Sequence, residues 1–400
     1  MTIFNKPADE INSDDIINLV NERTAERYNL EYKEAAYGSS DDDTREMLRD
    51  ISAMANAYGG YLILGIREDR ETGEAVEIVN IENADLHRDK IISACLSSIE
   101  PRIPGLNART VEVEGKKVLV IRIPRSLQAP HMVLYKGLYQ FWIRHDRQKS
   151  KMSVDEIRDA FLRVESFTKQ IDSFLREQKQ AARNSSQGKA LYVIGAAPVI
   201  LDDATVDITD SQIREIITTP PVRRTNGWYL NFDEYSARPK PFLHGLKISI
   251  DNYMQVLLFR NGYLEARIYI DEILDNTANV GGINGQSSPI INAYALIEFT
   301  VIFFIELKSL YSYLGVEGPY ATYLSLYNIN GYGIKENPEQ RPRPFSVQKW
   351  EDDDLEIAPL QINSVQDPDA NAKYFMDRVW QAFGFEEAPL FENGEFTPRS

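Results

Sequence analysis

The stretch that most constrains the fold of this chain is a helix that leads through two glycines directly into a buried strand. The sequence T-R-E-M-L-R-D-I-S-A-M-A-N-A-Y-G-G-Y-L-I-L-G-I-R-E-D occupies residues 44–69. Gly59 stands where a helix ends in the left-handed conformation, and Gly60 permits a close backbone approach. The apolar run 61–66 then predicts a buried strand. Helical spacing, with a cap at Asp43 or Thr44, predicts one apolar helix face made by Met47, Leu48, Ile51, Met54, Ala55 and Tyr58.

The length of the chain indicates more than one domain, because 400 residues exceed the size of an ordinary domain. Its single cysteine, Cys95, excludes an internal disulfide bond, and we expect it to pack in a helix core. The first residues lack the apolar core of a signal peptide, so we expect a cytoplasmic protein. Segment 294–314 is very apolar, but Glu298, Glu306 and Lys308 interrupt it. It therefore predicts a buried helix and no membrane span.

Residues 1–152 have the pattern of a mixed α/β domain. Alternating or continuous apolar runs predict strands at 30–33, 61–66, 75–81 and 138–144, and a hairpin over 110–123. Helices are expected at 14–20, along the Met47 face and after Asp85, with Leu86 among the apolar residues of the last one. Asp41, Asp42 and Asp43 are assigned to a loop.

Residues 153–188 predict a long helix and a linker. Ser153 and Glu156 have the spacing of a capping box, and N-S-S-Q-G-K at 184–189 is typical of a linker. The helix could lie against its own domain or pair with a second subunit. Its spacing of four and three residues is carried by Ile157, Phe161, Val164, Thr168, Ile171, Leu175 and Gln178.

Residues 189–400 predict a β-rich α+β domain, so the whole chain is assigned to the α+β class. Strands are expected at 191–201, 227–232 and 245–270, with a hairpin turn at 260–263, and a final helix at 369–383. The glycine-rich loop 280–288 lacks a phosphate-loop lysine. Strand aromatics usually belong to a core, although a ligand or partner site could be lined by Trp228, Tyr229, Tyr253 and Tyr263.

Positive charge is concentrated in one window of an acidic chain. The net charge is −16, yet residues 102–151 contain eleven basic and three acidic side chains. This asymmetry indicates a face that binds a polyanion, and a solvated basic surface is the alternative. The four histidines lack metal-ligand spacing, so neither zinc nor an organic cofactor is expected. The candidate nucleic-acid contacts are Arg102, Lys116, Lys117, Arg122, Arg144, Arg147 and Lys149.

Two motifs resemble the Schlafen AlbA_2 family. The first is A-E-R-Y-N-L-E-Y-K at 25–33, which follows the pattern E-x4-E-[YF]-K, and the second is S-A-M-A-N-A-Y-G-G-Y-L-I-L-G-I at 52–66. The resemblance covers residues 22–165 and implies a nucleic-acid-binding module, with RNA favoured over DNA. It also implies a short polar turn at 145–150, directly after the strand at 138–144. Vertebrate Schlafens carry two related lobes that face each other across a groove. This chain matches only one lobe, which favours a homodimer.

The resemblance also implies an acidic site. Schlafens that cleave RNA carry two glutamates in the first motif and an aspartate after the glycine-containing strand. Glu26 and Glu31 match the glutamates, Lys33 matches the lysine that follows, and Glu68 takes the place of the aspartate, with Asp69 as a substitute. These five are the candidate catalytic residues, and the four carboxylates are the candidate ligands of Mg²⁺ or Mn²⁺. A straight strand would place Glu26 and Glu31 on opposite faces, so a bend is required.

Several functions remain open at this level. The favoured one is nucleic-acid binding, combined with metal-dependent cleavage of tRNA or other structured RNA. The alternatives are a DNA-binding transcriptional regulator, a sensor or interaction protein without catalysis, and a nucleotide-binding role. In the last three, the acidic residues would be helix caps and surface charges around a binding groove.

Overall fold

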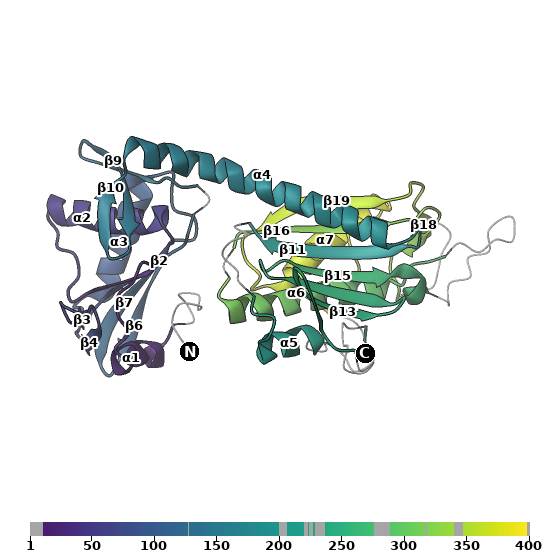
Figure 1. Ribbon diagram of the computed structural model, residues 1–400, viewed down its shortest axis with the longest axis horizontal. Helices are drawn as coiled ribbons and strands as arrows, with labels where there is room; N and C mark the ends of the chain where they lie inside the picture. Colours follow the sequence, from purple (N-terminus) through teal and green to yellow (C-terminus); the bar gives the residue numbers. More distant parts are fainter. Residues whose placement is uncertain are drawn as a thin grey trace, which may run out of the picture. The chain divides into compact units, whose positions relative to one another are not determined.

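The computed structural model describes residues 11–126, 128–199, 206–219, 223, 227–228, 237–275, 289–316, 318–339 and 347–397, except for the side chains of 163–166 and 168. The chain forms two compact units, Met1–Thr168 and Lys169–Ser400. Both contain helices and strands (Figure 1), which confirms the predicted α+β class. Within the described residues, no helix is both long and apolar enough to cross a membrane.

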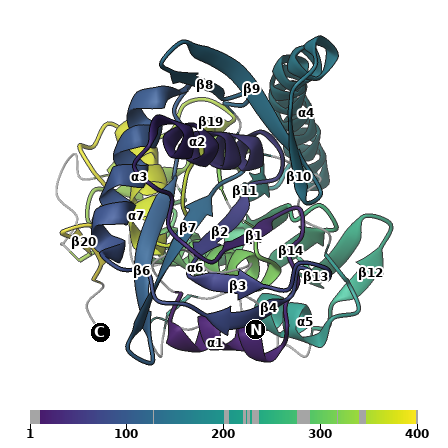
Figure 2. The same ribbon diagram turned by 90° about the vertical axis from the view of Figure 1, so that its left-hand side faces the viewer.

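A four-stranded sheet with the order β1-β2-β7-β6 forms the centre of the first unit. The parallel pair β1–β2 is connected through helix α2, and the other pairs are antiparallel. Helix α1 packs on one face of the sheet, and α2 and α3 pack on the other (Figure 2). The bounds are β1 Leu30–Lys33, β2 Gly60–Leu64, β6 Asn107–Val113, β7 Lys116–Ile123, α1 Ser13–Asn21, α2 Asp41–Asn56 and α3 Ala84–Ser98.

Two smaller sheets complete the first unit. Strands β3 (Ile66–Glu68) and β4 (Ala75–Ile78) form a hairpin. The other sheet has the order β10-β9-β8-β5, and the Asn56 amide fixes the end of α2 to it by donating to the carbonyl oxygens of His131 (2.9 Å) and Trp142 (2.8 Å). Its strands are β5 Ile99–Glu100, β8 Met132–Tyr135, β9 Leu138–His145 and β10 Gln148–Lys151.

Several predicted details of the first unit are wrong. Helix α2 begins at Asp41, because Ser40 is the N-cap and forms a capping box with Asp43. The three aspartates thus lie in the first turn, where negative charge stabilises a helix, and not in a loop. Tyr58 follows the helix and is 59% exposed, and Leu86 is 70% exposed. Part of the predicted polar turn 145–150 belongs to strand β10.

Cys95 is buried as predicted, and burial raises the pKa of its thiol to about 12.

A seven-stranded sheet with the order β12-β13-β14-β15-β11-β16-β19 dominates the second unit. All its strand pairs are antiparallel. One face carries the large apolar core under helices α5 (Ser211–Thr218), α6 (Ala293–Leu314) and α7 (Pro368–Ala382). The strand bounds are β11 Leu191–Pro198, β12 Lys240–Phe242, β13 Gly245–Ile250, β14 Met254–Phe259, β15 Leu264–Tyr269, β16 Tyr320–Tyr327 and β19 Leu355–Ile362.

Short elements complete the second unit. They are the 3₁₀ helix Ile270–Ile273, the hairpin of β17 (Gly333–Lys335) and β18 (Val347–Lys349), and the hairpin of β20 (Phe391–Glu392) and β21 (Glu395–Phe396). Helix α6 is buried, as predicted for the apolar segment. The loop 280–288, Tyr229 and most of the expected strand 227–232 lie outside the described residues. Trp228, Tyr253 and Tyr263 pack in or against the core.

The second half of helix α4 (Val154–Ser185) lies on the opposite face of the seven-stranded sheet, where buried apolar and charged side chains are mixed. Ile171 and Leu175 are buried, and Phe174 contacts Tyr263 edge-to-face with the ring centroids 5.1 Å apart. The capping box predicted at Ser153 and Glu156 is present at the start of this helix.

A charged group is buried beneath α4. Glu265 is fully buried and accepts hydrogen bonds from the hydroxyls of Tyr263 and Tyr323, the latter at 2.6 Å. Arg267 forms an ion pair with Glu265 and donates to Oγ of Ser185 at 2.9 Å. We call Tyr263, Glu265, Arg267 and Tyr323 the buried quartet. It links β15, β16 and the end of α4.

Candidate functional site

Strand β1 separates its apolar and charged side chains onto two faces. Leu30 and Tyr32 pack in the core with α1, whereas Glu31 and Lys33, at alternate positions, lie on the opposite side. Lys33 Nζ is 2.9 Å from Glu31 Oε1 and 3.3 Å from Asp50 Oδ2. Burial lowers the pKa of Lys33, but the neighbouring Asp50 and Glu31 outweigh this and raise it above the ordinary value. Lys33 is therefore a fixed ammonium group.

Asp50 is the centre of these contacts. Its side chain is 1% exposed, it accepts a hydrogen bond from the Tyr37 hydroxyl at 2.7 Å, and it pairs with Lys33 and with Lys149 of β10. Glu46, one turn earlier on α2, also pairs with Lys149. The sequence analysis missed Asp50. A signal was present, because a carboxylate at this position interrupts the apolar stripe of α2.

Arg144 extends the contacts to Glu31. The guanidinium is almost fully buried, forms an ion pair with Glu31 Oε2 and donates from Nε to the carbonyl oxygen of Asp146 at 2.8 Å. Carboxylates and cations thus alternate from α2 through β1 to the β9–β10 hairpin. We call Glu31, Lys33, Glu46, Asp50, Arg144 and Lys149 the charged network.

Glu26 and Glu68 meet at Arg147. The chain bends before β1, where Glu26 Oε1 accepts the backbone N–H of Tyr32 at 2.7 Å, which supplies the bend that the sequence required. Arg147 Nε lies 3.5 Å from Glu26 Oε2, and its Nη2 lies 3.7 Å from Glu68 Oε2. Burial raises the pKa of Glu26, and the neighbouring Glu68 raises it further. A Cβ at Gly73 would lie 2.4 Å from Arg147 Nη2, so a larger residue there would displace the end of the arginine side chain.

Asp69 has a local role in the turn between β3 and β4. Its Oδ1 accepts the backbone N–H groups of Glu71 (2.9 Å) and Thr72 (3.0 Å). These hydrogen bonds hold the pKa of Asp69 below its ordinary value. Its carboxylate is thus committed to the turn. Of the other predicted residues, Glu26 precedes β1, Glu31 and Lys33 lie within it, and Glu68 is the last residue of β3.

The carboxylates as arranged do not fit a divalent metal ion. Both oxygens of Glu31 face cations, those of Glu26 face a backbone N–H and Arg147, and Asp69 caps a turn. Within the described residues, no three side chains among His, Cys, Asp and Glu are placed to hold a metal. A divalent ion prefers several oxygen ligands in one shell, so it would have to displace Arg147 or Arg144.

The predicted basic contacts fall into separate groups. Arg144, Arg147 and Lys149 lie on or beside the β9–β10 hairpin and pair with carboxylates. Lys116 donates to the Ile78 carbonyl oxygen at 2.6 Å, and Lys117 lies 3.6 Å from Asp85. These two occupy the start of β7, whose turn with β6 lies at the opposite end of the unit from β9 in both views (Figures 1 and 2).

The remaining two predicted basic contacts lie elsewhere again. Arg122 stands opposite Tyr61 in the register of β7 and β2. Arg102 is exposed after β5. The basic window of the sequence is therefore not one continuous surface.

An exposed aromatic pair lies at the beginning of β1 and β2. The rings of Tyr28 and Tyr58 are 46% and 59% exposed and meet edge-to-face with centroids 5.1 Å apart. The guanidinium of Arg125, which follows β7, lies 5.8 Å from the Tyr58 ring centroid. We call Tyr28, Tyr58 and Arg125 the aromatic platform. The two tyrosines were not predicted as a site.

Gly59 and Gly60 bring this platform together. A Cβ at Gly60 would lie 2.1 Å from the carbonyl oxygen of Asn29, and a Cβ at Gly59 would lie 2.4 Å from the backbone nitrogen of Arg125. Both glycines also have positive φ angles, +67° and +131° in chain order. The backbone of this turn therefore lies in close contact with the segments that carry Tyr28 and Arg125, and Tyr58 lies between these two segments.

Comparison with known proteins agrees with the resemblance found in the sequence. The sequence model of the family described as Schlafen, AlbA_2 matches residues 26–153. This confirms the predicted relationship for the N-terminal part of the chain. No curated protein matches the chain.

Two solved structures are similar to part of the chain. One is the N-terminal domain of a protein from Nitrosomonas europaea described as related to the ATP-dependent DNA helicase RecG, with 22% identity and a TM-score of 0.27 over 36% of this chain and 94% of that one. The other is the DIP2311 protein from Corynebacterium diphtheriae, with 17% identity and a TM-score of 0.25 over 34% of this chain and 25% of that one.

Proposed function

We propose that the first unit binds nucleic acid in the cytoplasm and prefers single-stranded RNA to DNA. The observation that carries the proposal is the aromatic platform, in which two exposed tyrosine rings lie beside an arginine. The platform lies within residues 26–153, which match the Schlafen AlbA_2 family. The resemblance to this family implies a nucleic-acid-binding module. Bases of a single strand stack on exposed aromatic rings, and arginine contributes both stacking and charge.

The charged network would act as a support and not as the main phosphate contact. Arg144 and Lys149 of this network already face carboxylates of the same unit, as does Arg147 beside it. A phosphate reaching these cations would have to compete with those carboxylates. Binding should therefore depend on the aromatic platform more than the basic sequence window alone suggests.

Replacing Tyr58 by alanine is expected to weaken single-stranded RNA binding by roughly 5- to 100-fold, because stacking on one aromatic ring is worth about 1–3 kcal/mol per base. Tyr58 is more than half exposed, so the fold should survive the change. Fluorescence anisotropy with a labelled oligonucleotide measures the affinity. Tyr139→Ala on β9 is the matched control, because this tyrosine is 68% exposed and lies outside the platform.

The same assay separates the alternatives. Equal affinity for the wild-type chain and the Tyr58 variant would contradict the platform as the binding site. Tight binding of duplex DNA with a steep salt dependence would favour a transcriptional regulator. Absence of binding to RNA and DNA at low salt would leave a sensor or interaction role.

Metal-dependent cleavage of RNA is a second proposal, supported by the juxtaposition of the Glu26 and Glu68 carboxylates, and it requires a metal ion to displace Arg147 from them. Glu68 Oε2 is buried and has no hydrogen-bond partner among the described residues. If the proposal is correct, tRNA should be cut in the presence of Mg²⁺ or Mn²⁺. Glu68→Gln should then reduce the rate by roughly 100-fold or more, as expected on losing a metal-ion function. Gel electrophoresis of the products measures this.

The Glu68 variant keeps the size of the side chain at a partly exposed position, so RNA affinity provides the folding control. Glu71→Gln in the adjacent exposed turn is the matched variant that should retain full activity. If the wild-type chain binds tRNA with either ion present but leaves it intact, binding without cleavage is the function.

A homodimer formed through α4 is also proposed. Phe161 and Leu162 of this helix are 58% and 55% exposed, which gives it an apolar surface for a second copy. Light scattering of the full chain in solution tests this directly, since a monomer at all concentrations would contradict it.

A further inference from the structure

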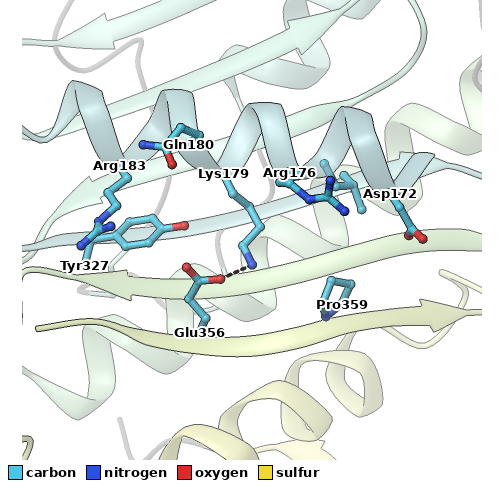
Figure 3. A pocket seen from close by; sticks show the side chains of 9 residues that line it. Asp172, Arg176, Lys179, Gln180, Arg183, Tyr327, Glu356 and Pro359 are labelled. Atoms are coloured by element: carbon cyan, nitrogen blue, oxygen red, sulfur yellow. Dashed lines mark hydrogen bonds and ion pairs between the residues drawn. The ribbon is translucent and has the colours of Figure 1, made fainter. Parts of the chain in front are cut away.

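The second unit contains a pocket that the proposed nucleic-acid function does not use. It lies between the second half of α4 and the strands β16 and β19, and its volume is about 390 Å³ (Figure 3). A cavity of this size falls within the range of small-molecule sites. All of its lining residues lie within Lys169–Ser400, so the pocket belongs to one compact unit.

Three cations of α4 line this pocket. Arg176, Lys179 and Arg183 are three and four residues apart and therefore share one face of the helix. Figure 3 shows Lys179 reaching from the helix to Glu356 of β19, with which it forms an ion pair. Arg183 lies 2.6 Å from Asp354. The pocket thus opens among positive groups in a chain whose net charge is −16.

Arg176 differs from the other two cations. It is exposed, and it forms no hydrogen bond or ion pair with any residue that the structure describes. The carboxylates that line the pocket are Asp172 and Glu356, and the latter is already paired with Lys179. A guanidinium is therefore available at the edge of the pocket, with geometry suited to two oxygens of one anion.

Tyr327 provides a second, independent observation. The residue is 1% exposed and lines the pocket, and its hydroxyl meets the full geometry of a hydrogen bond with no group in the described part of the chain. Its polar neighbour is the Ser325 hydroxyl, which is equally unpaired and moderates the rise in the Tyr327 pKa. Burial raises its pKa to about 12, so the hydroxyl keeps its proton and can donate it in a hydrogen bond. An unpaired buried hydroxyl is unfavourable, and a bound acceptor would remove this cost.

We propose that this pocket binds a small molecule carrying a phosphate group. Arg176 and Lys179 supply the charge, the Tyr327 hydroxyl donates a hydrogen bond, and Leu175 and Pro359 offer apolar contact to the remainder of the molecule. Phosphate is the chemistry that fits best, because its several oxygens can accept from a guanidinium, an ammonium and a hydroxyl at once.

The test is isothermal titration calorimetry of the full chain with pyrophosphate and, separately, with adenosine monophosphate. The wild-type chain should bind at least one of these probes. Arg176→Ala should weaken binding by roughly tenfold or more, as expected for a lost charged hydrogen bond, and Tyr327→Phe by roughly fivefold. Arg260→Ala, an exposed arginine of the same unit outside the pocket, should leave the affinity unchanged.

The phenylalanine variant keeps the folding question separate from the binding question. It removes only the hydroxyl oxygen, whose polar neighbour is the Ser325 hydroxyl, so its thermal midpoint should stay close to that of the wild-type chain. Failure of both probes to bind at millimolar concentration would overturn the proposal. Binding that is equally tight in Arg176→Ala and Tyr327→Phe would also overturn it, because the probe would then occupy another site.

Discussion

Replacing Glu265 by alanine is expected to lower the free energy of unfolding of the second unit by about 3–5 kcal/mol, the usual cost of leaving one partner of a buried ion pair alone. Arg267 would keep its charge at a position that is only 8% exposed, and the hydroxyls of Tyr263 and Tyr323 would lose their common acceptor. Chemical denaturation followed by circular dichroism measures the change. Because the chain has two units, the transition must be analysed as more than one step.

Two further variants decide whether the buried charge is the cause. Glu392→Ala removes an exposed glutamate of the same unit and should change the free energy of unfolding by less than about 0.5 kcal/mol. The double variant Glu265→Leu with Arg267→Met removes both charges, so it should recover part of the stability lost in the single variant. A single variant as stable as the wild-type chain would show that the quartet contributes little.

Replacing Asp50 by alanine should lower the free energy of unfolding of the first unit by about 2–3 kcal/mol, the range expected for losing hydrogen bonds to charged groups. The change removes the common partner of Lys33, Lys149 and Tyr37. The two lysines are partly exposed, so water can replace some of the hydrogen bonds that they lose with Asp50. Hydrogen exchange of α2 and β10, measured by mass spectrometry, should show faster exchange in both elements.

Asp42→Ala is the matched control for this second prediction. Asp42 lies on the same helix but is 91% exposed and pairs with Arg45. Surface pairs of this kind contribute little, so exchange in β10 should be unchanged. Unaltered exchange in β10 of the Asp50 variant would mean that the hairpin is held by other contacts, such as the Asn56 hydrogen bonds.

The elements of both units could largely be predicted, because apolar periodicity and glycines are local signals. The strand at Leu30–Lys33, the hairpin of β6 and β7, the turn before β15 and the buried helix α6 all follow from such signals. The start of α2 was misplaced because three aspartates suggest a loop, while Ser40 four residues before Thr44 caps the helix. Sheet order in the second unit pairs β11 with β16, strands far apart in the chain, and no local pattern predicts this.

The candidate site was only partly predictable. The family motifs indicated a site made of Glu26, Glu31, Lys33 and Glu68, and these residues do lie near one another. Sequence position could not reveal that the basic residues of β9 and β10 face these same carboxylates. Charge counting treats a cation as available unless its partner is known. The aromatic platform was missed for a different reason. Helical spacing assigned Tyr58 to the apolar face of α2, but this helix ends two residues before it and the side chain is exposed.

The single helix α4 has a practical consequence for anyone dividing this chain into fragments. Residues on both sides of position 168 belong to the same helix, yet the boundary between the two compact units falls there in the sequence. A truncation at 188 would attach Ile171 and Leu175 to the first unit with nothing to cover them. A fragment beginning at 189 would uncover the face of the long sheet that carries the buried quartet and admit water to Glu265. Cutting near 168 leaves each half with the turns of helix that it packs against.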